Sequence, residues 1–126
     1  MTAAAAWPSR AMHGLLAYAD RLWLLGGLHM DAGSGSLQRV GLNDVWSSAN
    51  GVDWRLATAE APWTIRAGHA AVVGPRAAAG GGGGDSVMYV LGGRGRFGDG
   101  TDVFLNDVWR SGDGVAWDPV TASAPW

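Results

Sequence analysis

The chain has 126 residues, 48% of them hydrophobic and 16% charged, a composition too apolar for an intrinsically disordered protein. Its nine basic residues are all arginines scattered along the sequence, and eleven acidic residues bring the net charge to −2. This distribution argues against binding to nucleic acid or to anionic membranes. The absence of cysteine excludes disulfides, thiolate metal sites and a cysteine nucleophile.

The first residues contain neither a basic segment nor a long apolar core, so they do not resemble a signal peptide. No stretch approaches the roughly 18 consecutive apolar residues that a membrane-spanning helix requires. We therefore expect a soluble protein, and the compartment in which it works stays open.

Four short strands are predicted in the first half of the chain, over residues 13–18, 22–25, 43–48 and 53–58. The same order returns in the second half, over residues 69–74, 87–91, 106–111 and 116–121. The dipeptides Asn50-Gly51 and Asp113-Gly114 separate the last two strands of each set, and they favour the left-handed backbone of a tight hairpin. A glycine-rich tract within residues 75–85 is predicted to be a loop.

An internal repeat relates these two sets of strands. The segment Leu42–Trp46 returns as Leu105–Trp109, and Asn50–Trp54 returns as Asp113–Trp117. The sequence divides into a first unit over residues 1–60, a second over residues 61–123, and the start of a third over residues 124–126, where Ala61-Pro62-Trp63 returns as Ala124-Pro125-Trp126. Insertions and deletions fall between the shared motifs, where loops tolerate them.

A strand that ends in a glycine pair, followed by an Asn-Asp-Val-Trp strand and a further tryptophan, resembles the kelch repeat. The matching residues of the second unit are Arg66, His69, Met88–Gly93, Asn106–Trp109 and Trp117, and the first unit repeats the pattern. The resemblance implies an all-β fold, a segment of a kelch-type β-propeller with about two four-stranded antiparallel blades. Kelch propellers serve as adaptors, as carbohydrate binders and occasionally as enzymes, so the resemblance does not select one function.

Two blades are too few for a closed propeller, which typically has 4–8. Either the chain is a piece of a longer protein, as the start of a third unit favours, or copies of it assemble until a ring closes. Its partners therefore include further blades, from the same chain or from other copies.

Residues that recur in both units are expected to build the fold rather than to perform chemistry. We expect the histidines to be hydrogen-bonded at the start of each inner strand, and the arginines to pair with backbone or acidic groups between blades. We expect the aspartates to occupy turns or strand ends, and the tryptophans to form the core between the sheets. The positions are Arg10, His13, Gly26, Gly27, Asp44, Trp46, Trp54, Arg66, His69, Gly92, Gly93, Asp107, Trp109 and Trp117.

The segments after the glycine pairs, residues 29–41 and 94–104, differ between the units and are expected to be loops that share one face of the molecule. They hold the candidate binding residues, which are His29, Asp31, Arg94, Arg96, Phe97, Asp99 and Asp102. Two aspartates fall short of a calcium site, and the Gly-Gly-Arg-Gly segment lacks the lysine and the helix of a phosphate-binding loop. No metal, cofactor or catalytic residue is assigned.

The sequence thus predicts a non-catalytic binding scaffold that recognises a protein or glycan through its inter-strand loops. Two alternatives stay open. The chain could be part of a carbohydrate-active propeller enzyme, or it could be a structural homo-oligomer.

Overall fold

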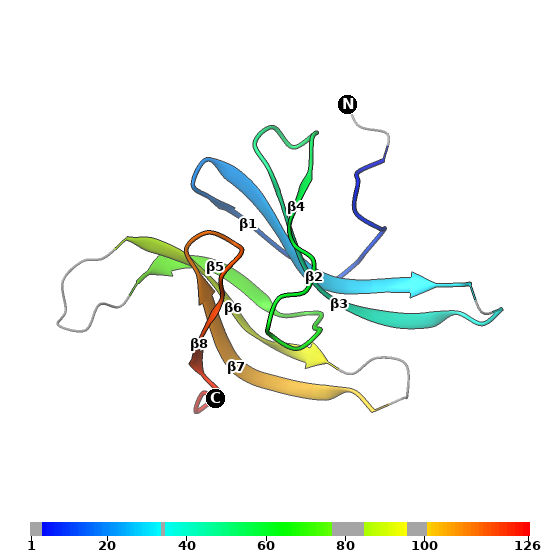
Figure 1. Ribbon diagram of the computed structural model, residues 1–126. Helices are drawn as coiled ribbons and strands as arrows, with labels where there is room; N and C mark the ends of the chain where they lie inside the picture. The colour runs from blue at the N-terminus through cyan, green and yellow to red at the C-terminus, as the bar shows by residue number, and fades with distance from the viewer. Residues whose placement is uncertain (1–3, 34, 77–84, 96–100) are drawn as a thin grey trace.

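A computed structural model describes residues 4–33, 35–76, 85–95 and 101–126, and within these residues the chain is all-β. The strands are β1 (Gly14–Tyr18), β2 (Arg21–Asp31), β3 (Gln38–Ser48), β4 (Arg55–Thr58), β5 (Ala70–Pro75), β6 (Ser86–Gly95), β7 (Val103–Ser111) and β8 (Asp118–Thr121). They form two four-stranded antiparallel sheets with the orders β1-β2-β3-β4 and β5-β6-β7-β8. The architecture, with the two sheets packed side by side, is consistent with two blades of a propeller (Figure 1). No helix long and apolar enough to cross a membrane occurs among these residues.

The second and third strands of each sheet are longer than the sequence predicts. The register between β2 and β3 shifts at the glycine pair, between Leu25 and Gly27, and pairing then continues as far as Asp31 and Gln38. The second sheet shows the same shift between Leu91 and Gly93, and its pairing continues to Gly95. A bulge displaces the pairing by one residue without ending it. The prediction of loops over residues 29–41 and 94–104 is therefore wrong for most of the described residues in these ranges. These extensions project toward the same side of the molecule (Figure 1).

The hairpins β3–β4 and β7–β8 follow the expected turn chemistry. The side chain of Asn50 accepts hydrogen bonds from the backbone N–H groups of Val52 and Asp53, at 2.9 and 2.8 Å. Asp113 repeats these two contacts with Val115 and Ala116, both at 2.9 Å. The turn role predicted for the asparagine and the aspartate is therefore confirmed. Each fourth strand begins later than predicted because residues 53–54 and 116–117 belong to these turns.

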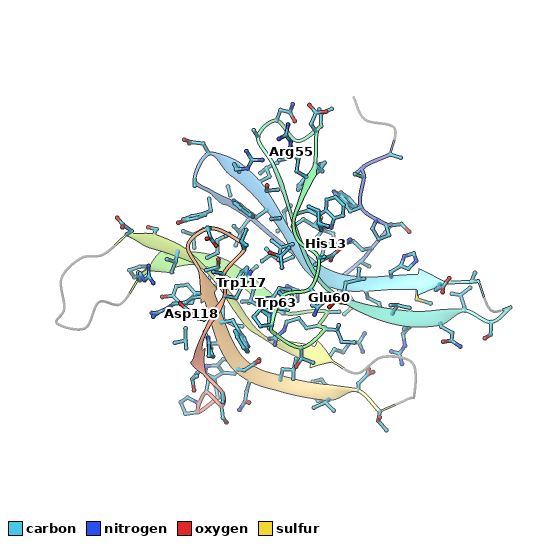
Figure 2. All side chains as sticks on the ribbon, viewed as in Figure 1. His13, Arg55, Glu60, Trp63, Trp117 and Asp118 are labelled. Atoms are coloured by element: carbon cyan, nitrogen blue, oxygen red, sulfur yellow. The ribbon has the colours of Figure 1, made fainter. Side chains whose placement is uncertain are left out.

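One hydrophobic core fills the space between the two sheets. The first sheet contributes Leu16, Trp23, Leu25 and Val45, and the second repeat contributes Ala61, Trp63, Met88, Val90 and Trp117. The rings of Trp63 and Trp117 meet edge to face, with centroids 5.8 Å apart. Figure 2 shows these two rings beside each other between the sheets. We call this packed boundary the seam. The prediction that the tryptophans form the core between the sheets is right for these two rings, and the partly buried Trp109 packs against that core. It is wrong for Trp46 and Trp54, which lie outside this core, and for Trp126, which is 65% exposed.

The β7–β8 turn presses against the first sheet. A Cβ atom built on Gly114 would lie 2.1 Å from the ring of Trp23, whereas a Cβ on the equivalent Gly51 would meet only the side chain of Leu22, at 3.7 Å. Both glycines have positive φ angles, 77° and 76°. The seam therefore requires a glycine at residue 114 for space as well as for its backbone conformation.

Comparing Gly51 with Gly114 separates the effect of backbone conformation, which both share, from the effect of limited space, which applies only to Gly114. We expect Gly51→Ala to lower the free energy of unfolding by about 1 kcal/mol, because alanine adopts the left-handed conformation at a cost. Gly114→Ala should cost about 1–3 kcal/mol more, because its methyl group overlaps the Trp23 ring. Urea unfolding of both variants measures the difference. Equal costs would show that the ring moves aside freely and that the turn does not hold the seam.

Candidate functional site

An arginine, an aspartate and two tryptophans form the same cluster in each repeat. The guanidinium of Arg66 donates from Nη1 and Nη2 to the two carboxylate oxygens of Asp107, both at 2.8 Å, and from Nη1 to the carbonyl of Gly92 at 2.9 Å. Trp109 donates its indole N–H to the same carboxylate at 2.7 Å. The Arg66 guanidinium also lies over the Trp63 ring, 5.6 Å from its centroid.

The first repeat reproduces these contacts. Arg10 donates to both carboxylate oxygens of Asp44, at 2.6 and 2.9 Å, and to the carbonyl of Gly26 at 3.0 Å. Trp46 donates to Asp44 at 2.7 Å. The predicted pairing of the arginines with acidic and backbone groups is confirmed, but the expectation that it runs between blades is wrong, because each arginine side chain pairs within its own repeat.

The aspartates do not occupy turns or strand ends, and that expectation is wrong. Asp44 lies inside β3 and Asp107 inside β7. Burial opposes ionisation of Asp107, but hydrogen bonds from Arg66 and Trp109, with the charge of Arg66, lower the pKa of its carboxyl group. Both aspartates are thus strand residues whose carboxylates are bound by their own repeat.

The two repeated histidines precede the inner strands β1 and β5. Within the described residues, Nδ1 of His13 and both ring nitrogens of His69 make no hydrogen bond of normal distance and angle, contrary to expectation. A backbone group of Leu25 nevertheless lies close enough to the His69 ring to raise its pKa, which opposes part of the lowering described below. His69 is held by packing, because a Cβ on Gly93 would lie 2.8 Å from its own Cβ. Burial, and then the positive charge of Arg66, lower the pKa of His69 to about 4, and burial and Arg10 lower that of His13. Both changes favour uncharged rings at neutral pH.

The candidate binding residues are only partly brought together. Asp102 pairs with Arg94 at 3.1 Å and, across the seam, with Arg39 of β3 at 3.5 Å. His29 and Asp31 lie on β2 and make local contacts, to the carbonyl of Ser9 at 2.8 Å and to the N–H of Gly33 at 2.9 Å. The remaining three candidates, Arg96, Phe97 and Asp99, lie outside the described residues.

A cleft of about 490 Å³ lies beside the Arg94–Asp102 pair, at the end of the seam where β6 and β7 extend past the glycine pair. It is lined by Met12, Ala67, Gly68, Gly93, Arg94, Phe104 and Leu105. Arg94 is the one charged residue among these, and Phe104 is 85% exposed. The cleft joins the two repeats, since the N–H of Gly68 donates to the carbonyl of Met12 at 2.8 Å.

Sequence reasoning found Arg94 but missed Met12, Phe104 and Leu105. A signal for Phe104 was present, because a large apolar residue stands where the first unit has Gly41. Met12 gave no such signal, since it lies in a connecting segment and adopts a positive φ of 57°.

Comparison of the sequence with family models gives no match, and no curated protein matches it. Within the described ranges, no group of three or more histidine, cysteine, aspartate or glutamate side chains is placed to hold a metal ion.

The buried ring of His69 predicts a loss of stability in mild acid. In the unfolded chain the ring takes up a proton near its ordinary pKa of 6.5, but in the folded chain only at about 4. Between these values the unfolded chain binds more protons, so the free energy of unfolding falls as the pH is lowered through this window and is unaffected by this group above it. The loss approaches about 3 kcal/mol, at 1.36 kcal/mol per pKa unit.

Urea unfolding across this pH range, on the wild-type chain and on His69→Gln, tests the assignment. Glutamine does not titrate, so the variant should show a flatter dependence, with the remaining slope due in part to His13. Leu37→Gln, a substitution of an exposed residue that does not titrate, serves as the control and should keep the wild-type slope. The carboxylates of Asp107 and Asp113, whose pKa values are lowered from 3.8, keep their stabilising effect through this window and lose it only in stronger acid. An unchanged slope in His69→Gln would rule the buried ring out as the source.

Proposed function

We propose that the chain is a kelch-like propeller segment that acts as a non-catalytic binding scaffold, and that its cleft captures a protein partner through an acidic, partly apolar segment. The observation that carries the proposal is the position of Arg94, the one charged residue lining a cleft otherwise formed by backbone and apolar side chains. The kelch-like assignment is supported by the repeated glycine pairs and by the two antiparallel sheets.

The chemistry of the cleft suits such a segment. At the cleft, the Arg94 guanidinium donates to Asp102 at 3.1 Å and to the sulfur of Met12 at 3.7 Å. A guanidinium is permanently charged and its planar fork of N–H donors matches a carboxylate, so we expect this side chain to attract an acidic group of a ligand. Met12, Phe104 and Leu105 offer apolar surface beside that charge. Methionine adapts its shape to different partners, and an exposed aromatic ring supplies a large contact area.

The repeated polar residues support a scaffold rather than a catalytic role for the repeats. Arg10, Arg66, Asp44 and Asp107 are bound to one another and to backbone carbonyls within their own repeats. A ligand group that engaged them would first have to break those contacts. The cleft residues, by contrast, include a side chain that is almost fully exposed, Phe104.

A glycan is the second candidate ligand, because the exposed Phe104 ring offers a flat face on which a sugar can stack. The two ligands differ in their response to salt. Capture of a carboxylate by Arg94 weakens as ionic strength rises, whereas stacking of a neutral sugar hardly changes.

Binding to an array of short peptides that combine aspartate or glutamate with leucine or phenylalanine tests the proposal. We expect Arg94→Ala to weaken binding about tenfold, because it removes a charge-assisted hydrogen bond. Phe104→Ala should weaken binding through lost apolar contact. Both variants should unfold within about 1 kcal/mol of the wild type, because each changes an exposed or partly exposed side chain.

Arg55→Ala is the matched control, since it removes an exposed arginine from β4 (Figure 2), a strand that contributes no residue to the cleft lining. It should leave peptide binding unchanged. Binding to a parallel array of neutral glycans, lost in Phe104→Ala but kept in Arg94→Ala, would favour the glycan. Peptide binding that Arg55→Ala weakens as much as Arg94→Ala would contradict the assignment of the cleft.

A further inference from the structure

The internal seam shows what each outward sheet face can bind. Within the chain, one face of the β1–β4 sheet packs against one face of the β5–β8 sheet. Because the two sheets are repeats, the outward face of β5–β8 carries the counterparts of the residues by which β1–β4 enters the seam. Likewise, the outward face of β1–β4 carries the counterparts of the residues that β5–β8 contributes. The two outward faces therefore carry side chains that correspond, position by position, to those of the two faces packed in the seam.

We propose that the outward face of the β5–β8 sheet binds the outward face of the β1–β4 sheet of a second copy of this chain, in the head-to-tail arrangement of the internal seam. This association is separate from ligand binding at the cleft. Successive copies joined in this way make a heterologous assembly, which closes as a ring or grows as a filament according to the angle between blades.

Strand register identifies the residues of the first face. Leu25 pairs with Gly14 as Leu91 pairs with Ala70, and Trp23 pairs with Leu16 as Tyr89 pairs with Val72. Leu16, Leu25 and Val45 are buried in the seam, whereas their counterparts Val72, Leu91 and Val108 are partly or largely exposed. The change from Leu16 to Val72, from 8% to 47% exposed, marks apolar surface that the seam covers in one repeat and leaves open in the other.

The second face has the matching surface. Leu15, Leu22 and Leu56 are exposed on it, at 55%, 38% and 48%. The glycine of the hairpin turn is covered in one repeat and open in the other: Gly114 is buried under the Trp23 ring, whereas the equivalent Gly51 is exposed. In the proposed contact the ring of Tyr89, the counterpart of Trp23, covers Gly51 of the second copy.

Three features differ from the internal seam and make the proposed contact looser. Gly74 replaces Tyr18, so the hydrogen bonds from the Tyr18 hydroxyl to the carbonyls of Ser86 and Gly112 have no counterpart. In the internal seam, a Cβ atom on Gly14 would lie only 2.7 Å from the Cβ of Ala71. In the proposed contact between two copies, Ala70 takes the place of Gly14 and Leu15 of the second copy takes the place of Ala71. The inner strands of two copies must therefore stand farther apart than β1 and β5 do.

The third difference is at Trp126, which is the counterpart of Trp7 and of Trp63. Trp126 lies beside Gly92, where its ring would be 3.4 Å from a Cβ atom on that residue. A second copy brings its own Trp7, already packed edge to face on Trp54 at 5.8 Å, to the same region. The exposed Trp126 ring has to move out of this region before the second copy can bind. We therefore expect weak association in the wild-type chain.

Sedimentation of the full chain from micromolar to millimolar concentration tests the proposal. The wild-type mass should rise with concentration, and Val72→Lys should remain monomeric because it places a charge in the contact. The matched control is Leu37→Lys, which removes an exposed apolar residue between β2 and β3, away from both faces. It should associate as the wild type does, and so should Arg94→Ala, whose effect is confined to the cleft.

The double variant Ala70→Gly, Trp126→Ala removes both obstacles and should lower the dissociation constant several-fold. A double variant that is folded by circular dichroism but monomeric at every concentration overturns the proposal. Association that Val72→Lys and Leu37→Lys weaken equally overturns it as well, since that result means non-specific contact.

Discussion

The structure depends on a buried guanidinium. The Arg66 side chain is fully buried, and a buried charge is tolerated only where a counter-charge and hydrogen-bond acceptors surround it. Asp107 of β7 and the carbonyl of Gly92 on β6 supply them. The Arg66 side chain thus joins the segment that links the two sheets to two strands of the second sheet. Arg10 joins the segment before β1 to two strands of the first sheet, β2 and β3.

This anchoring sets the position of the segments that follow. With Arg66 fixed, its backbone carbonyl accepts from Gly27 at 2.9 Å and its N–H donates to Leu42 at 3.1 Å, so the linking segment is bound to the first sheet too. His69 then lies just before the inner strand β5, against Gly93, where only a residue without a side chain leaves room. The seam, the buried histidine and the cleft beside Gly68 all follow from this one placement.

The sequence predicted the local features well, because they depend on neighbouring residues. The eight strands and the hairpin turns at Asn50-Gly51 and Asp113-Gly114 were all expected from short motifs. The partner of each arginine could not be predicted, because Arg66 and Asp107 are 41 residues apart and meet only once the sheet has formed. The strand extensions were missed for a related reason. A glycine pair precedes each extension, and a glycine pair is typical of the end of a strand; the pairing continues because a bulge displaces the ladder without ending it.

The contrast between residues that recur in both repeats and residues that differ indicates which positions are free to change. A side chain that recurs in both repeats is committed to an ion pair, a turn or the seam, so its replacement weakens a blade. Met12, Phe104 and Leu105 line the cleft without entering the hydrophobic core. Phe104 shows this freedom most clearly, because the equivalent place in the first repeat is the glycine at residue 41 and both sheets still form. Under the proposed function, the residues that contact a ligand can thus change at the cleft while the arginine, the aspartate and the glycine pair keep the blade unchanged.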